Sequence, residues 1–216
     1  TIKGDFSLEG LQGFDLKGKT LGVVGSGHIG LHVIKIAKGF GMEVLVYDVR
    51  KDVFLSEVLD FRYAPLKELL RHSDIVSLHV PYVPATHHLM NRATFQLMKR
   101  GALFINTARG GLVDTDALVW ALDEGIVGGA ALDVLEGEEL VKEERQLLSK
   151  DFSKEKLATA LRNHILLHRE NVVITPHIAF DSREALHRIL ETTVNNIAGF
   201  LSGSPTNLVV SPRSTR

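Results

Sequence analysis

A glycine motif near the start of the chain constrains the fold most strongly. The segment Gly25–Gly30 has the spacing G-x-G-x-x-G. An apolar run, 20–24, precedes it, apolar residues at helical spacing occupy 31–40, and a second apolar run, 44–47, follows. This order predicts a βαβ unit of about thirty residues in which the glycine loop joins the first strand to the helix. A glycine loop in that setting is typical of dinucleotide-binding folds.

The rest of the chain continues the alternation of strands and helices. Further strands are expected at 75–80, 103–106, 130–132 and 172–174. Further helices are expected at 66–71, 92–99, 116–124 and 182–201. This pattern predicts an α/β fold, a doubly wound parallel sheet with right-handed crossovers.

One segment interrupts the alternation. Residues of about 139–171 lie between two strands and are rich in Lys, Glu, Leu and Arg, so we expect a helical insertion there, with Ser153 as its N-cap. We expect residues 1–209 to form one dinucleotide-binding domain and residues 210–216 to form a frayed tail.

Composition narrows the possible chemistry. The 216 residues include no cysteine, which excludes disulfides, thiolate catalysis and cysteine-bound metal centres. The formal net charge of -1 gives no sign of a nucleic-acid or anionic-membrane partner. No apolar run approaches the roughly 18 residues that cross a bilayer, and no signal peptide is visible at the start. We therefore expect a cytoplasmic protein that binds neither nucleic acid nor membrane.

Each glycine of the motif has a separate expected role. Gly25 permits the tight turn, Gly27 lets the backbone approach a pyrophosphate, and Gly30 lets the helix pack closely on the sheet. The phosphates would bind the N–H groups at the helix start, where the dipole is positive. Asp48, at the end of the next strand, would accept hydrogen bonds from the adenosine ribose, which favours NAD over NADP. Arg50 leaves this preference open, because a nearby arginine can accommodate a 2′-phosphate.

Polar residues after the later strands fit the reduction of a 2-keto acid. Arg109 lies in a glycine-bounded turn, and its guanidinium can bind a carboxylate and polarise a carbonyl. His177 can transfer a proton near neutral pH, and Glu138 is a candidate partner that would fix its tautomer and favour its protonated form. Asp133 could accept a hydrogen bond from the nicotinamide amide. Taken alone, Arg109 could instead be a surface arginine, His177 a structural histidine and Asp133 a helix cap or a solvated acid.

Taken together, these motifs resemble the D-2-hydroxyacid dehydrogenase family. The matching segments are Gly25–Gly30, Asp48, His79-Val80-Pro81, Asn106–Gly110, Ala131–Val134 and Thr175-Pro176-His177. The resemblance implies that Arg109 binds the substrate and that Glu138 pairs with His177, the acid/base. It also implies an NAD site lined by residues on the loops after the strands. These residues are Gly25, Gly27, His28, Ile29, Gly30, Asp48, His79, Val80, Pro81, Thr86, Thr107, Ala108, Arg109 and Asp133.

Within the family, the chain is most similar to the D-lactate dehydrogenase branch. The similarity lies in Phe6–Gly10, in the insertion after Glu138 and in Pro176–Phe180. This branch implies pyruvate as the 2-keto acid, and the family implies a homodimer through the cofactor domain.

Family members begin with a substrate domain that closes over the nicotinamide, whereas this chain starts where their second domain starts. The helix at 182–201 would return toward that first domain. We therefore expect apolar residues near Ile197, Phe200 and Leu201 to be exposed or to pair with another chain.

Other interpretations of these motifs remain open. A non-enzymatic NAD-sensing domain of the corepressor type would keep Arg109, Glu138 and His177. A methyltransferase using S-adenosylmethionine would give Arg109 and His177 no role. His164 and His168 have a spacing that can bind metal, but a surface helix explains them more simply, and the pair His87-His88 is interpreted as part of a loop.

Overall fold

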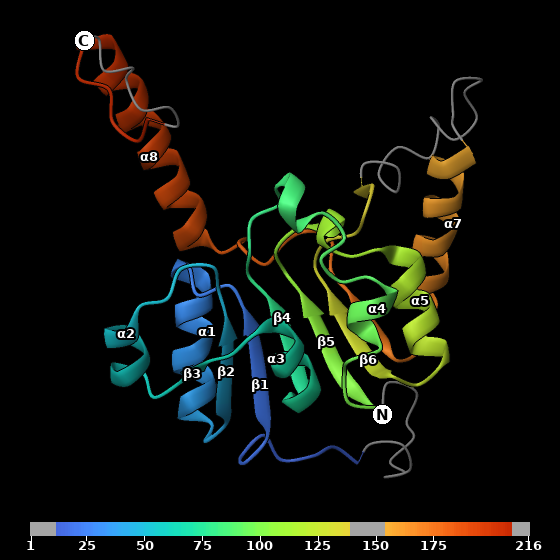
Figure 1. Ribbon diagram of the computed structural model, residues 1–216. Coiled ribbons are helices and arrows are strands. Elements are labelled where there is room, and N and C mark those ends of the chain that lie inside the picture. The colour runs from blue at the N-terminus through green and yellow to red at the C-terminus, as the bar shows by residue number, and fades with distance from the viewer. Residues whose placement is uncertain (1–11, 139–153, 209–216) are drawn as a thin grey trace, which may run out of the picture. The chain divides into compact units, whose positions relative to one another are not determined.

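A computed structural model describes residues 12–138 and 154–208 (Figure 1). The chain divides into two compact units, Thr1–Pro176 and His177–Arg216. The first unit contains a seven-stranded parallel sheet with helices on both of its faces, and the second contains one long helix.

The element bounds are as follows. The strands are β1 (Thr20–Val24), β2 (Glu43–Tyr47), β3 (Arg62–Tyr63), β4 (Ile75–Leu78), β5 (Ala102–Asn106), β6 (Val127–Leu132) and β7 (Val172–Ile174). The α-helices of the first unit are α1 (His28–Gly39), α2 (Val53–Val58), α3 (Leu66–His72), α4 (Arg92–Phe95), α5 (Thr115–Asp123) and α7 (Lys154–Leu167). Two short 3₁₀ helices are η1 (Pro84–Thr86) and η2 (Gly110–Leu112), and the second unit contains α8 (Arg183–Leu201).

The strand order creates a single switch point in the sheet. The order is β3-β2-β1-β4-β5-β6-β7, and all neighbouring strands are parallel. The chain therefore winds in one direction from β1 to β3 and then in the other direction from β4 to β7. The loops after β1 and β4 diverge at their carboxyl ends, which is where ligands bind in open α/β sheets.

The two faces of the sheet carry separate hydrophobic cores. On one face, Val23 of β1 and Ile34 of α1 are fully buried. On the other face, Phe104 of β5 packs with Leu69 of α3 and Leu118 of α5. Because successive residues of a strand point to opposite faces, the central strands supply apolar side chains to both cores. This double burial explains why these strands are continuous apolar runs in the sequence.

The predicted fold class is confirmed, while several boundaries differ. The first helix begins at His28, three residues before the predicted start, because Gly27 in the glycine loop is itself the N-cap. The strand predicted at 75–80 ends at Leu78, and the strand predicted at 130–132 begins at Val127. The prediction of a helix over 92–99 was wrong beyond Phe95, where the chain continues in turns.

Two short elements were missed. Helix α2 has six residues, none of them buried, and strand β3 has only two residues, at the edge of the sheet. Elements this short carry too little hydrophobic periodicity to be found from sequence.

Helix α7 confirms a helix within the predicted insertion, but Ser153 and the rest of 139–153 lie outside the described residues. Helix α8 matches its prediction, and the Ser182 hydroxyl caps it by accepting from the Ala185 N–H at 3.1 Å. Its apolar residues Ile197, Phe200 and Leu201 are exposed within their own unit. In the described part of the chain, no helix has the length and apolarity to cross a membrane. That residues 1–209 form a single domain stays a prediction.

The packing of Phe104 gives a test of the larger core. Its ring meets that of Phe95 edge to face, with centroids 5.3 Å apart, and both residues are fully buried. Replacing Phe104 by alanine is expected to lower the free energy of unfolding by about 3–5 kcal/mol, measured by urea denaturation. The control is Phe54→Ala in α2, where the side chain is 72% exposed and the loss is expected to stay below about 1 kcal/mol. Equal losses in the two variants would contradict this description of the core.

Candidate functional site

The carboxyl ends of the central strands open into a pocket of about 580 Å³. This volume is within the range of small-molecule binding sites. The pocket is lined by the start of α1, the loop after β4 and the turn after β5. The lining residues are Gly27, His28, Ile29, His79, Val80, Pro81, Tyr82, Thr107, Ala108 and Arg109. Sequence reasoning named all of these residues except Tyr82.

The three glycines of the motif meet different surroundings. Gly25 has a positive φ of 103°, and a Cβ there would lie 2.8 Å from the backbone carbonyl of His79. A Cβ on Gly30 would lie 2.0 Å from the carbonyl oxygen of Gly25. A Cβ on Gly27 would meet no protein atom within 4 Å. The packing of the chain itself therefore requires Gly25 and Gly30, whereas Gly27 leaves backbone open toward the pocket.

Asp48 is tied to the glycine loop. Its Oδ2 accepts hydrogen bonds from the Ser26 N–H at 2.7 Å and the Ser26 hydroxyl at 2.9 Å, and its Oδ1 accepts from the Arg50 N–H. Burial by itself raises the pKa of Asp48, but these hydrogen bonds outweigh it and hold the pKa below its ordinary value. The carboxylate is therefore ionised at neutral pH and able to accept hydrogen bonds from hydroxyl groups.

Two further residues support Asp48 and were not found from sequence. Ser26, at a variable position of the glycine motif, lies with its hydroxyl 3.4 Å from that of Tyr63 in β3. The Tyr63 hydroxyl also accepts a hydrogen bond from the Asp52 N–H at 3.1 Å. No sequence signal joins these residues, because Tyr63 belongs to a strand too short to be recognised.

His79 forms part of the pocket wall beside the glycine loop. Its Nε2 lies 2.9 Å from the hydroxyl of Ser77, which is buried in β4. Burial lowers the pKa of His79, because a charged imidazole loses hydration there. We infer that His79 is neutral at pH 7 and contributes shape and a hydrogen bond rather than charge.

The turn that carries Arg109 is fixed by a buried asparagine. Asn106, at the end of β5, is 1% exposed. Its Oδ1 accepts a hydrogen bond from the Ala108 N–H, and its Nδ2 donates one to the Arg109 carbonyl at 2.9 Å. The next residue, Gly110, packs so closely that a Cβ would lie 2.0 Å from the carbonyl oxygen of Leu135. The turn is therefore held both by side-chain hydrogen bonds and by direct backbone packing.

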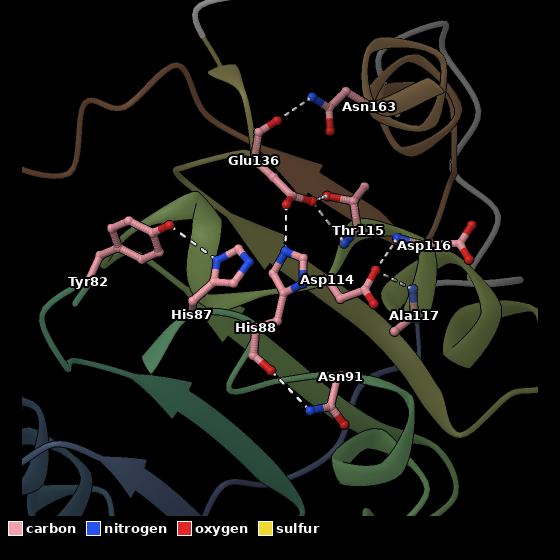
Figure 2. A network of polar contacts seen from close by, with 10 residues as sticks. All are labelled: Tyr82, His87, His88, Asn91, Asp114, Thr115, Asp116, Ala117, Glu136 and Asn163. Carbon is pink, nitrogen blue, oxygen red and sulfur yellow. Dashed lines mark hydrogen bonds and ion pairs between the residues drawn. The ribbon is translucent and has the colours of Figure 1, made fainter. Parts of the chain in front are cut away.

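A polar network centred on Glu136 joins three segments next to this turn (Figure 2). Its Oε1 lies 2.6 Å from His88 Nε2, and its Oε2 accepts from the hydroxyl of Thr115 at 2.8 Å and from the Thr115 N–H. Asn163 of α7 donates from Nδ2 to the Glu136 carbonyl at 2.9 Å. The network fixes the segment that leads to Glu138. His87 and His88 lie in a loop, as predicted from the sequence, but the ion pair of His88 was not anticipated.

The other predicted site residues lie as follows. Thr86 is in η1, where its hydroxyl donates to the Pro81 carbonyl, and it is not among the described residues that line the pocket. Asp133 is 4% exposed and accepts a hydrogen bond from the Thr175 hydroxyl. Glu138 is half-buried at the end of the described segment. Glu138 and His177 belong to different units of the chain, and their pairing stays a prediction.

His177, in the second unit, has an unusual backbone. Its φ is 57°, in the left-handed region that non-glycine residues adopt infrequently. Its ring meets that of Phe180 nearly edge to face, with centroids 6.4 Å apart. Residues held in such conformations cluster at functional sites.

Metal ligands do not gather in the described regions. No group of three or more His, Cys, Asp or Glu side chains there is placed to hold an ion. His164 lies on α7 and His168 directly after its end, and His168 Nδ1 lies 2.8 Å from the His164 carbonyl oxygen.

The doubly wound sheet, the glycine loop at a helix start and the ionised Asp48 define a dinucleotide-binding domain. Residues 2–179 match the family model described as D-isomer specific 2-hydroxyacid dehydrogenase, NAD binding domain. The chain therefore belongs to the D-isomer specific 2-hydroxyacid dehydrogenases, and it contains the NAD-binding domain of that family.

Known proteins are similar to this chain over nearly all of it. The 2-hydroxyacid dehydrogenase homolog 2 of Schizosaccharomyces pombe is 43% identical, over 93% of this chain and 58% of its own length. The D-specific alpha-keto acid dehydrogenase of Enterococcus faecalis is 43% identical, over 91% of this chain and 57% of its own length. The solved D-lactate dehydrogenase of Aquifex aeolicus, complexed with NAD and lactic acid, is 40% identical with a TM-score of 0.87, covering 98% of this chain and 63% of that one.

None of these three relatives is described as a corepressor or a methyltransferase. The chain spans about 60% of the length of the relatives that it matches.

The Glu136 network predicts a pH-dependent contribution to stability. Burial by itself raises the pKa of Glu136, but hydrogen bonds from His88 and Thr115 outweigh it and lower the pKa below its ordinary value. The contribution is therefore complete above the unfolded pKa of about 4.3 and is lost as the pH falls through the lower folded pKa. At pH 7, Glu136→Gln is expected to lower the free energy of unfolding by about 1–3 kcal/mol.

The measurement is urea denaturation of both proteins at pH 7 and at several values below about 4.3. The deficit of the variant should shrink in acid. Glu57→Gln, on the exposed face of α2, removes the same charge and should show no such trend. A deficit for Glu136→Gln that stays constant with pH would contradict the proposed role of the carboxylate.

Proposed function

We propose that the chain acts in an NAD-dependent D-2-hydroxyacid dehydrogenase that reduces a 2-keto acid such as pyruvate. The observation that carries this proposal is the presence of Arg109 in the same pocket as the glycine loop at the start of α1. An arginine at that place can hold a carboxylate next to a bound dinucleotide. The relatives named above support the same reaction class.

The residues of the pocket fit NAD. No side chain caps the start of α1, so its first N–H groups can bind the pyrophosphate beside the open backbone of Gly27. At the adenosine end, the ionised Asp48 suits two ribose hydroxyls and disfavours a 2′-phosphate. When bound, NADH supplies the hydride that reduces the carbonyl carbon.

The chain supplies the polar groups that this reduction needs. We assign to Arg109 the binding of the substrate carboxylate and the polarisation of the keto group. His177 gives a proton to the carbonyl oxygen as the carbon is reduced, and Glu138 orients the imidazole. In the reverse direction, the neutral imidazole accepts the proton of the 2-hydroxyl group.

The finer parts of the proposal rest on the family resemblance. We propose a D-lactate-like substrate range because the chain is similar to a D-lactate dehydrogenase solved with lactic acid. We also propose a homodimer formed through the cofactor domain and a cytoplasmic location.

The first test is titration of the chain with NADH, followed by nicotinamide fluorescence. We expect saturable binding that is at least about tenfold tighter than that of NADPH, because Asp48 repels the extra phosphate. Pyruvate-dependent oxidation of NADH, measured on a form of the protein that also carries the family's substrate domain, tests the reaction itself. His177→Asn should abolish that oxidation and leave NADH affinity unchanged. Absence of NADH binding, or full turnover by His177→Asn, would contradict the proposal.

Two glycine-to-alanine variants separate cofactor binding from folding. Gly27→Ala should lower the free energy of unfolding by less than about 1 kcal/mol, the cost of a poorer N-cap. It should bind NADH at least about tenfold more weakly, because its methyl group occupies the pocket and no protein atom opposes it. Gly30→Ala should lower the free energy of unfolding by about 2 kcal/mol or more, because its Cβ meets the backbone of Gly25. Thermal unfolding and NADH titration measure both effects. Unchanged NADH affinity in Gly27→Ala would argue against a pyrophosphate at this loop.

A further inference from the structure

The structure places one aromatic side chain, which no sequence motif indicated, in the pocket. Tyr82 follows Pro81 in the loop after β4 and lines the pocket together with Arg109. It is 50% exposed although its ring is large and apolar. An aromatic ring that faces a pocket offers a surface for stacking or edge contact with a ligand ring.

Two neighbours set the orientation of the Tyr82 ring. Its hydroxyl lies 3.1 Å from Nδ1 of His87, and the two rings meet edge to face with centroids 5.9 Å apart. On the other side, a Cβ on Gly111 would lie 2.8 Å from Cε2 of the tyrosine ring. The absence of a side chain at Gly111 therefore makes the space in which the ring lies.

The loop behind Tyr82 is firmly held (Figure 2). The His87 ring stacks on that of His88 at 3.8 Å. His88 has a positive φ of 48°. Its N–H donates a hydrogen bond to the Gly111 carbonyl, and its own carbonyl accepts one from the Asn91 side chain. Its Nε2 lies within hydrogen-bond distance of Glu136. A strained residue persists where several contacts determine it. Several contacts therefore hold the loop that supports the exposed Tyr82 ring. A tyrosine that contacted only solvent would not require a loop held in this way.

The location of Tyr82 indicates which half of the cofactor it meets. In the proposed binding mode the pyrophosphate lies at Gly27, which lines the pocket together with Arg109. The adenosine ribose lies at Asp48, which binds the glycine loop through Ser26 and is not among the described residues that line the pocket. If Arg109 holds the substrate carboxylate, the reacting nicotinamide ring must lie at the Arg109 end. Tyr82 belongs to that end, since its ring lies against Gly111, two residues beyond Arg109.

We propose that Tyr82 is a positioning residue that contacts the nicotinamide half of NAD. His87 orients its ring, and the absence of a side chain at Gly111 leaves space for it. This inference rests on the proposed function. Its physical basis is the contact of an aromatic ring with the neutral dihydronicotinamide ring of NADH or with the cationic pyridinium ring of NAD⁺. The ring restricts the positions open to the nicotinamide before the substrate binds.

The experiment compares two ligands on the 216-residue chain. NADH contains the nicotinamide, whereas ADP-ribose contains only the rest of the molecule. Tyr82→Ala should weaken NADH binding by roughly two- to tenfold and leave ADP-ribose binding unchanged. Tyr82→Phe, which keeps the ring, should lose less. Isothermal titration calorimetry measures both ligands under the same conditions.

Gly111→Ala tests the orientation of the ring. The new methyl group should displace the tyrosine ring and reproduce the loss of NADH affinity. In the Tyr82→Ala background the same substitution should have no further effect, because no ring remains to be displaced. Thermal unfolding of every variant checks that the fold is kept. Tyr63→Phe, which removes a hydroxyl that contacts Ser26 of the glycine loop, is the matched control and should change both affinities by the same factor.

The outcomes separate this inference from the proposed function. Failure of the unsubstituted chain to bind either ligand would overturn the proposed function, and this inference with it. Normal binding with an unchanged ratio of NADH to ADP-ribose affinity in Tyr82→Ala and Gly111→Ala would overturn the role of Tyr82 alone. Full additivity of the two substitutions would show that Gly111 does not act through the ring.

Discussion

Close approach of backbone to backbone is the constraint on which the site depends. The glycine loop packs against the end of β4 and against the first turn of α1 with no space for a Cβ at Gly25 or Gly30. The turn after Arg109 packs against the Leu135 carbonyl in the same way. These contacts join the loop after β1 to the end of β4, and the turn after β5 to the segment after β6, at the carboxyl edge of the sheet. A ligand can then meet N–H groups, a guanidinium and an aromatic ring within one pocket.

Hydrogen bonds to two carboxylates complete what backbone packing begins. Asp48 binds the glycine loop through Ser26, so the group proposed to recognise the ribose also holds the loop proposed to bind the pyrophosphate. Glu136 connects the loop of His88, the start of α5 at Thr115 and, through its carbonyl, α7 at Asn163. In both places hydrogen bonds outweigh burial and keep the carboxylate ionised. The charged groups of the site are therefore also structural ties between its loops.

Sequence reasoning succeeded where function depends on residues close together in the chain. The βαβ unit around Gly25–Gly30 was predicted because strand, loop, helix and strand follow each other without interruption. The position of Arg109 was predicted because a glycine-bounded turn follows a strand. The ion pair of His88 with Glu136 and the contact of Tyr63 with Ser26 were missed. Their partners are 48 and 37 residues apart, and no local pattern joins them.

The sequence by itself determined the fold class, the cofactor loop and the family. Each of these follows from the apolar periodicity and from residue types that fit only certain backbone conformations. Tertiary structure alone decided that Tyr82 lines the pocket and that Gly111 makes room for its ring. It also decided that Glu136 is the centre of a hydrogen-bond network and not a solvated acid. The physical reason is that a residue's type limits which contacts it can make, whereas the packing of distant segments selects which of those contacts form.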